Sequence, residues 1–193
     1  MEGKYLYFAS GTTAPDAVGE SILYPVNSIA GVEPFASTKL KIFFTPRNTS
    51  SFVEDDNEFV VLKITSNKHK QVTDAIIAEI NSGSRDGGFI TVSDEPNSIS
   101  LNSDILTTST TATALVNSGS ISNTTTIPVD GKSGTITLGD TVSNTGASGT
   151  VRVSAINAQD TTTANLTLDT SVSISDNTSL TFTHEAVRIS LVS

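Results

Sequence analysis

From Thr110 onward, apolar residues alternate with serine and threonine in short runs separated by turn residues. A period of two places successive side chains on opposite faces of a strand, which is incompatible with a helix. The predicted strands span residues 124–129, 134–138, 149–156, 165–170, 172–175, 179–184 and 186–193. Many short strands with Asp-Gly, Gly-Asp and Ser-Asp-Asn turns between them indicate a small β-sandwich or barrel.

The first half of the chain has a different composition and predicts a small sheet with one helix. It contains seven of the eight phenylalanines, all three tyrosines and eight of the eleven basic residues. Runs of aromatic and branched residues predict strands at 4–8, 39–44 and 58–65, all in one sheet, and a further strand at 87–94 after the helix. The predicted fold class is therefore mainly β, with an N-terminal α+β domain and a C-terminal β domain.

The helix is expected over about Lys68–Asn81. Apolar residues recur there at every fourth position and form one stripe: Val72, Ile76 and Ile80. Ser66 or Asn67 is expected to cap its start, and Gly83 to end it.

The change in composition predicts two domains, at residues 1–109 and 110–193. The final strand, 186–193, has two possible places. It completes the second domain, or it returns to pair with the first, in which case residues from about 110 to 183 are an insertion in a loop of domain one.

Composition excludes several kinds of chemistry. The chain has no cysteine, which rules out disulfides, thiolate metal sites and cysteine nucleophiles. Its 11 basic residues are outnumbered by 20 acidic ones, and an acidic surface repels nucleic acid and anionic lipid. The start has no secretory signal pattern, and no window approaches the ~20 apolar residues of a membrane span. We expect a soluble protein, folded in a cytoplasm, that binds neither nucleic acid nor membrane.

Gly131, Lys132 and Ser133 match the end of a nucleotide-binding phosphate loop. That motif needs a glycine five residues before Gly131, where Thr126 stands, and a helix after Ser133, where Thr-Ile-Thr-Leu predicts a strand. Asp130-Gly131 instead suits a tight hairpin turn with Lys132 and Ser133 solvated at its tip. Nucleotide binding is therefore not expected.

Other candidates for catalysis or metal binding lack a complete pattern. His69 and His184 have no Gly-x-Ser-x-Gly motif to join and are expected to be solvated or at an interface. The acidic run at 54–58 lacks the spacing of a calcium loop and predicts a charged hairpin tip. Lys-His-Lys at 68–70 predicts a solvated first turn of the helix. We assign no catalytic, cofactor-binding or metal-ligating residue, and the partner-binding residues stay unknown.

Five segments of the first half, from "GKYLYFAS" to "GGFITVSDEPNSISLNSDI", carry a family resemblance. They lie at residues 3–10, 21–34, 38–48, 60–83 and 87–105. They resemble small virion structural proteins of tailed marine phages, especially those that infect cyanobacteria. In the second half, residues 121–183 are similar to a Ser/Thr/Gly-rich β module of phage surface proteins, in which Gly-Thr-Val and Asp-Asn-Thr turns separate short strands.

The resemblance implies a virion component with no catalytic residues and no cofactor. Within the particle we expect a capsid decoration, or cement, protein on the capsid surface. Its α+β domain would bind the major capsid protein while the β domain projects, and self-association as a dimer or trimer stays open. Such a protein stabilises the shell by covering surface across neighbouring subunits. It predicts a sheet edge or an apolar patch on residues 1–109.

Two other functions remain as alternatives. A tail, neck or fibre component would bind a host receptor or glycan through the β domain. Phe182 is the only aromatic residue there, which leaves few rings for stacking on sugars. A glycan hydrolase would need a cleft with two carboxyl groups of raised pKa, and the sequence contains no motif for one.

Overall fold

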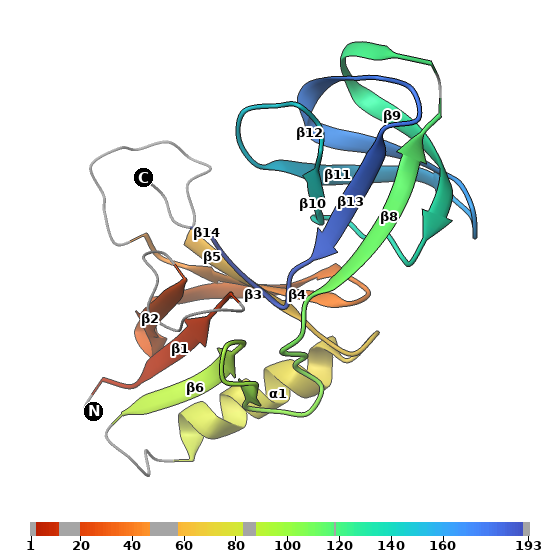
Figure 1. Ribbon diagram of the computed structural model, residues 1–193. Coiled ribbons are helices and arrows are strands. Elements are labelled where there is room, and N and C mark those ends of the chain that lie inside the picture. Colours follow the sequence, from red (N-terminus) through yellow and green to blue (C-terminus); the bar gives the residue numbers. More distant parts are fainter. Residues whose placement is uncertain (1–2, 12–19, 47–57, 83–87, 118, 191–193) are drawn as a thin grey trace. The chain divides into compact units, whose positions relative to one another are not determined.

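The computed structural model of the protein describes residues 3–11, 20–46, 58–82, 88–117 and 119–190. Over these residues the fold is mainly β with one α-helix, which confirms the predicted fold class. The chain forms two compact units (Figure 1). The first unit contains the described residues up to Thr108 and those from Ala186 on, and the second comprises Ser109–Glu185.

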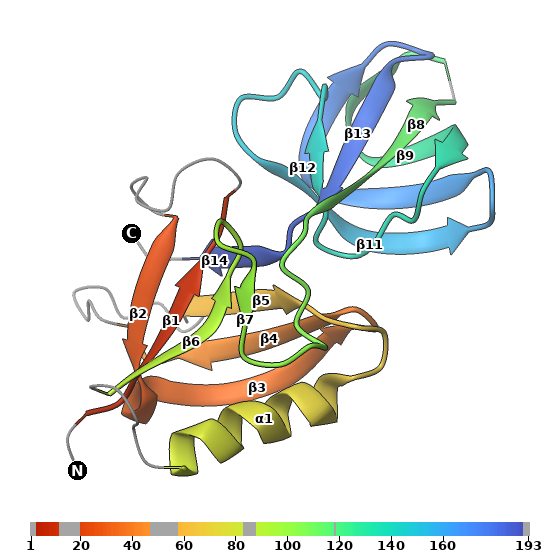
Figure 2. The same cartoon turned by 60° about the horizontal axis from the view of Figure 1, so that its bottom comes forward.

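The first unit contains a four-stranded sheet in the order β2-β1-β6-β7 (Figure 2). Its strands are β1 (Tyr5–Ala9), β2 (Ser21–Pro25), β6 (Phe89–Asp94) and β7 (Ile99–Ser100). Strand β1 pairs antiparallel with β2 and parallel with β6. Alternate side chains of β1 are buried, as the period of a half-buried strand requires.

A second sheet of the same unit has the order β14-β5-β4-β3, with all pairs antiparallel. Its strands are β3 (Ile29–Ala36), β4 (Lys39–Phe44), β5 (Glu58–Lys63) and β14 (Val187–Ser190). A short 3-10 helix, η1 (Val26–Ser28), connects β2 to β3. Of the two places open for the final strand, the chain adopts the one in the first unit, because β14 pairs with β5.

The expectation that the early strands share one sheet is wrong. Strands β1 and β6 lie in one sheet, and β4 and β5 lie in another. Strands β2 and β3 were not predicted at all. The two sheets share one core, because the ring of Tyr24 on β2 stacks on Phe44 of β4, with centroids 3.8 Å apart and planes 5° apart. Phe8 of β1 meets Phe44 edge-on, at 6.0 Å between centroids.

The helix α1 (His69–Asn81) confirms the predicted span to within one residue. Val72 and Ile76 are buried, and Ile80 packs against the same core. The predicted caps are wrong: Lys68 is the N-cap residue and makes no side-chain capping bond. Asn67 adopts a left-handed conformation (φ 62°) and donates its N–H to the carbonyl of Ser37, so the helix begins later. Gly83 lies outside the described residues.

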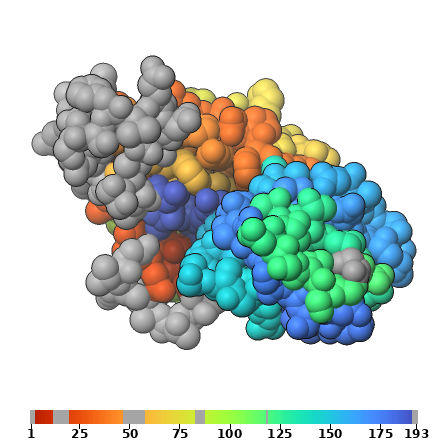
Figure 3. All heavy atoms as spheres, turned by 90° about the horizontal axis from the view of Figure 1, so that it is seen from above, coloured from red at the N-terminus to blue at the C-terminus, as the bar shows by residue number. Residues whose placement is uncertain are grey.

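The second unit is a closed barrel of six strands in the order β10-β11-β12-β9-β8-β13. They are β8 (Thr110–Val116), β9 (Ile121–Ser133), β10 (Thr141–Ser143), β11 (Val151–Gln159), β12 (Ala164–Ile174) and β13 (Ser179–His184). The first and last strands, β8 and β13, are paired, and their green and blue segments lie side by side in Figure 3. The barrel closes because β10 and β13, the two ends of this strand order, also pair with each other, which leaves no unpaired edge there.

The barrel's core is almost entirely aliphatic. Alternate residues point inward and are buried, among them Val116, Ile127, Leu166 and Leu180. Phe182 is the one ring among them and is 1% exposed. The predicted strand at 134–138 is wrong, because this segment leaves the sheet as a loop, and β8 and β10 were missed.

Candidate functional site

Three large apolar side chains stand exposed on the outer face of the β2-β1-β6 sheet. They are Tyr5, Leu23 and Phe89, with exposed fractions of 45%, 47% and 51%. Tyr5 is the cross-strand partner of Phe89, and Tyr7 is the partner of Leu23, so all four side chains lie on one face. The Tyr7 and Phe89 rings meet edge-to-face, with centroids 5.3 Å apart. We call Tyr5, Tyr7, Leu23 and Phe89 the aromatic face.

The aromatic face arises from a strand that is apolar on both sides. In β1, Leu6 and Phe8 are fully buried in the core, and the alternation then sends Tyr5 and Tyr7 outward. A sheet with one solvated face normally carries polar residues there. Sequence reasoning found this strand but not its outward face. The available signal was that both alternating sets in residues 5–8 are apolar.

The second sheet carries a cluster of rings and cations on the face opposite its core. The ammonium Nζ of Lys41 lies 4.4 Å from the ring centroids of both Phe43 and Phe59. The guanidinium of Arg188 lies 5.1 Å from the Phe59 centroid, and Glu33 Oε1 lies 3.9 Å from Lys41 Nζ. Burial lowers the pKa of Lys41, Glu33 opposes that effect, and Arg188 adds to it.

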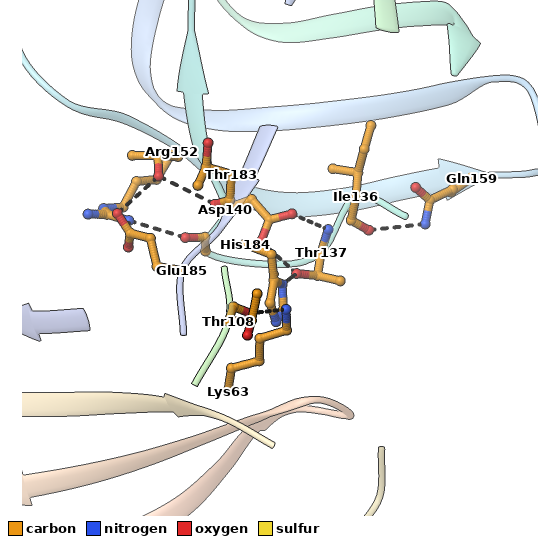
Figure 4. A network of polar contacts seen from close by, with 12 residues as sticks. Lys63, Thr108, Ile136, Thr137, Asp140, Arg152, Gln159, Thr183, His184 and Glu185 are labelled. Carbon is orange, nitrogen blue, oxygen red and sulfur yellow. Dashed lines mark hydrogen bonds and ion pairs between the residues drawn. The ribbon is translucent and has the colours of Figure 1, made fainter. Parts of the chain in front are cut away.

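In the barrel, a buried polar network joins the loop at 137–140 to the end of β13 (Figure 4). The Asp140 carboxylate accepts two bonds of 2.7 Å from Thr137, one from its backbone N–H and one from its hydroxyl. His184 Nδ1 lies 3.0 Å from Asp140 Oδ1. Because an ionised carboxylate only accepts, Nδ1 carries the hydrogen in this pair. His184 is 5% exposed, so of the two places expected for it, in solvent or at an interface, the solvated one is wrong.

This network does not have the geometry of a hydrolytic triad. A triad needs the nucleophile's hydroxyl at one ring nitrogen of the histidine and the carboxylate at the other. Here the Thr137 hydroxyl and the Asp140 carboxylate both lie at Nδ1 of His184. The hydroxyl also donates to Asp140, so the imidazole is not placed to remove its proton. The arrangement holds the loop to β13.

A second, partly buried set of contacts holds the same strand end. Arg152 Nη1 of β11 lies 2.9 Å from Glu185 Oε2 and donates to the carbonyl of Gly139 at 3.3 Å. Thr141 donates its hydroxyl to Glu185 Oε1 at 3.1 Å. Three segments of the barrel are therefore tied together where β13 ends (Figure 4).

The predicted hairpin turn at Asp130-Gly131 is wrong. Both residues lie inside β9, which continues to Ser133. Asp130 pairs with Leu115 and Ser133 with Thr113, so β9 advances three residues where β8 advances two. Gly131 (φ 57°) supplies the left-handed conformation that such a bulge requires. The segment after Ser133 is a loop rather than a helix, so no helix N-terminus is present to hold a phosphate.

The other candidates from the sequence are dispersed. His69 Nε2 lies 2.7 Å from the Ala36 carbonyl at the end of β3, and Lys70 forms an ion pair with Asp74 one turn along α1. Residues 54–57 of the acidic run lie outside the described residues. Glu58 is 3% exposed at the start of β5 rather than at a solvated tip.

Within the described part of the chain, no group of three or more acidic or histidine side chains could hold a metal ion. None of the helices placed there is long and apolar enough to cross a membrane. Comparison with known proteins found no matching family model, no matching curated protein and no matching solved structure.

Proposed function

We propose that this chain is a non-enzymatic virion structural protein of a tailed phage, a capsid decoration protein that binds the major capsid protein. The observation that carries the proposal is the aromatic face of the first unit. Contiguous exposed apolar patches are uncommon on proteins that work alone, and they mark surfaces that a partner covers. The family resemblance of residues 3–106 supplies the kind of partner.

The chemistry of the aromatic face suits a protein partner. None of its four residues is charged, although the chain has a net charge of −9, so charge repulsion does not oppose contact at this place. Covering a large apolar side chain contributes about 1.5–3 kcal/mol at full burial, and Tyr5, Leu23 and Phe89 are about half exposed before binding. Tyrosine also offers a hydroxyl that can hydrogen-bond at the rim of an interface.

A sheet face suits this binding better than the outer edge of β3, with which no other described strand pairs. That edge strand contains Pro34, which has no N–H to donate. Two register shifts, at Ile29/Gly31 and at Pro34/Ala36, also interrupt its pairing with β4. Bulges and proline are the usual devices that prevent a further strand from adding to an edge.

The barrel supports the decoration protein over the glycan-binding alternative. Sugar-binding sites stack their ligands on exposed rings, and the barrel's one ring, Phe182, is buried in its core. The Thr137–Asp140–His184 network lacks triad geometry, which favours a non-enzymatic protein.

The test is binding of the purified chain to capsids prepared without it. Phe89→Ser and Leu23→Ser should each weaken binding about tenfold or more, because each removes apolar area from the aromatic face. Ile77→Ser is the matched control: Ile77 is 50% exposed but lies on α1, so binding should change less than about twofold.

Copy number gives an independent measurement. A decoration protein should be present in many copies per particle, which quantitative mass spectrometry of purified virions would measure. About a dozen copies or fewer would indicate a neck, tail or fibre ring instead. Unchanged capsid binding by Phe89→Ser and Leu23→Ser would also count against the proposal.

A further inference from the structure

Two segments far apart in the sequence share one edge of β5. On the side away from β4, Leu62 of β5 pairs with Val187 and Val61 pairs with Arg188, both from β14. Past Leu62, the same edge is paired with residues 104–106. Ile64 bridges Ile105 antiparallel, Leu106 N–H donates to the Lys63 carbonyl at 2.9 Å, and Thr65 N–H donates to the Asp104 carbonyl at 2.8 Å.

The two segments meet in register at Lys63. Ile105 lies opposite Ile64 and Val187 lies opposite Leu62, so one residue position remains opposite Lys63. In a continuous antiparallel strand, a single residue there would both donate to and accept from Lys63. Here Leu106 supplies the N–H, and Ala186 supplies the carbonyl that accepts from Lys63 N–H at 2.8 Å.

The alternation of inward and outward side chains also continues unbroken from residues 104–106 to β14. Ile105 and Val187 are each 2% exposed and belong to the same core cluster, and Ile189 packs against it. Arg188, between Val187 and Ile189, lies on the opposite face, over Phe59. Because strand side chains alternate with a period of two, a slip of one residue would have reversed these faces.

We infer that residues 104–106 and β14 are two halves of a single edge strand, and that residues 107–186, which include the barrel, are inserted between them. The insertion is therefore in a strand and not in a loop. The barrel's own ends are adjacent, because Thr110 on β8 pairs with His184 on β13. The side chain of Lys63 adds a 2.8 Å bond from Nζ to the Thr108 carbonyl on the outgoing chain (Figure 4).

With this topology, the strands and the core of the first unit need no residue of the barrel. The barrel is then an exchangeable module. Removing residues 107–186 would join Leu106 to Val187 and leave an unbroken strand opposite Lys63. The inference does not depend on the proposed capsid binding, since it concerns which parts of the chain complete each core.

The first test uses the full chain with a destabilised barrel. Leu166→Ala removes a fully buried side chain from the barrel core. Hydrogen exchange followed by NMR should show amides of β12 exchanging at least about tenfold faster, while those of Lys63 and Leu106 change less than about threefold. Exchange at Lys63 and Leu106 that accelerates in step with β12 would overturn the inference.

The second test removes the module and varies the register of the join. A chain lacking residues 107–186 joins Leu106 to Val187 and should unfold cooperatively, with Lys63 and Arg188 amides protected. The matched control lacks 107–187 and joins Leu106 to Arg188. This moves the guanidinium to the core position opposite Leu62, so the control should lose most of that protection. Failure of the direct join to fold, or equal protection in the two variants, would overturn the inference.

Discussion

In both units the side chains of a strand alternate between the core and the outer face, but the outward side chains differ in kind. In the first unit, β1 buries Leu6 and Phe8 while its outward positions are Tyr5 and Tyr7. In the barrel, β8 buries alanine and valine while its outward positions are mostly threonine. Threonine hydroxyls are satisfied by water and by cross-strand neighbours, whereas an exposed ring gains when a partner covers it. The outward set of side chains, rather than the strand pattern, therefore distinguishes the exposed surfaces of the two units.

The cores of the two units differ in the same way as their outward faces, with aromatic rings in the first unit and mainly aliphatic side chains in the barrel. The first unit joins its two sheets through the rings of Phe8, Tyr24 and Phe44. The barrel closes on itself, and its narrow interior is filled by aliphatic side chains. Two of its buried polar side chains, Asp140 and His184, lie in one network with Thr137. Stability should therefore depend on ring packing in the first unit. In the barrel it should depend on aliphatic packing and on the hydrogen-bonded network of Thr137, Asp140 and His184.

The largest effect is expected from removing a core ring. Phe44→Ala should lower the free energy of unfolding of the first unit by about 3–5 kcal/mol, because the cavity would adjoin both Tyr24 and Phe8. Phe182→Ala should have a similar cost but confine it to the barrel. Urea unfolding, with hydrogen exchange assigning the loss to a unit, measures both effects. If either variant weakened both units equally, the two cores would not be independent.

A smaller loss of stability is expected from breaking the hydrogen-bonded network of Thr137, Asp140 and His184. Asp140→Ala leaves two donors of Thr137 and Nδ1 of His184 without their acceptor in a buried place, which should cost the barrel about 2–4 kcal/mol. The control is Asp176→Ala, because Asp176 is exposed and accepts from Gly119 N–H at 3.1 Å. Its cost should stay near or below about 1 kcal/mol. Equal losses in urea unfolding would show that the Asp140 network adds no more than a surface contact does.

Local patterns predicted some elements of the first unit well. The span of β4 and the helix followed from residues close in sequence, because alternation and a four-residue stripe need no distant partner. The division of the first unit into two sheets depends on contacts such as Tyr24 with Phe44, which no local pattern encodes. The predicted strand at 134–138 failed because Thr137 bonds to Asp140, so turn chemistry overrode strand propensity.

Some features of the candidate sites are likewise encoded in the local sequence, whereas others depend on contacts between distant residues. The aromatic face was within reach of the sequence, since residues 5–8 are apolar at every position. The pairing of Asp140 with His184 was not, because the two lie 44 residues apart and meet only when the barrel closes. Gly131 shows a third case. A bulge and a tight hairpin turn both use its left-handed conformation, and pairing with β8 selects the bulge.

The smallest expected effect concerns the turn between β11 and β12. The Asp160 carboxylate accepts from the backbone N–H groups of Thr163 and Thr162 and from the Thr163 hydroxyl, and these bonds lower its pKa from 3.8 to about 2. A carboxyl group whose pKa is lower in the folded state stabilises the fold above its unfolded pKa. That contribution should be present above about pH 4 and be lost as the pH falls towards about 2.

Asp160→Asn removes the charge and keeps a side-chain oxygen that can accept. The unfolding free energy of the barrel should therefore depend less on pH in the variant than in the parent chain between about pH 4 and pH 2. Urea titrations at several pH values in that range measure the difference. The difference should persist in about 0.5 M salt, because short hydrogen bonds to the backbone are screened far less than exposed charge pairs. Identical pH profiles would show that the turn makes no charge-dependent contribution.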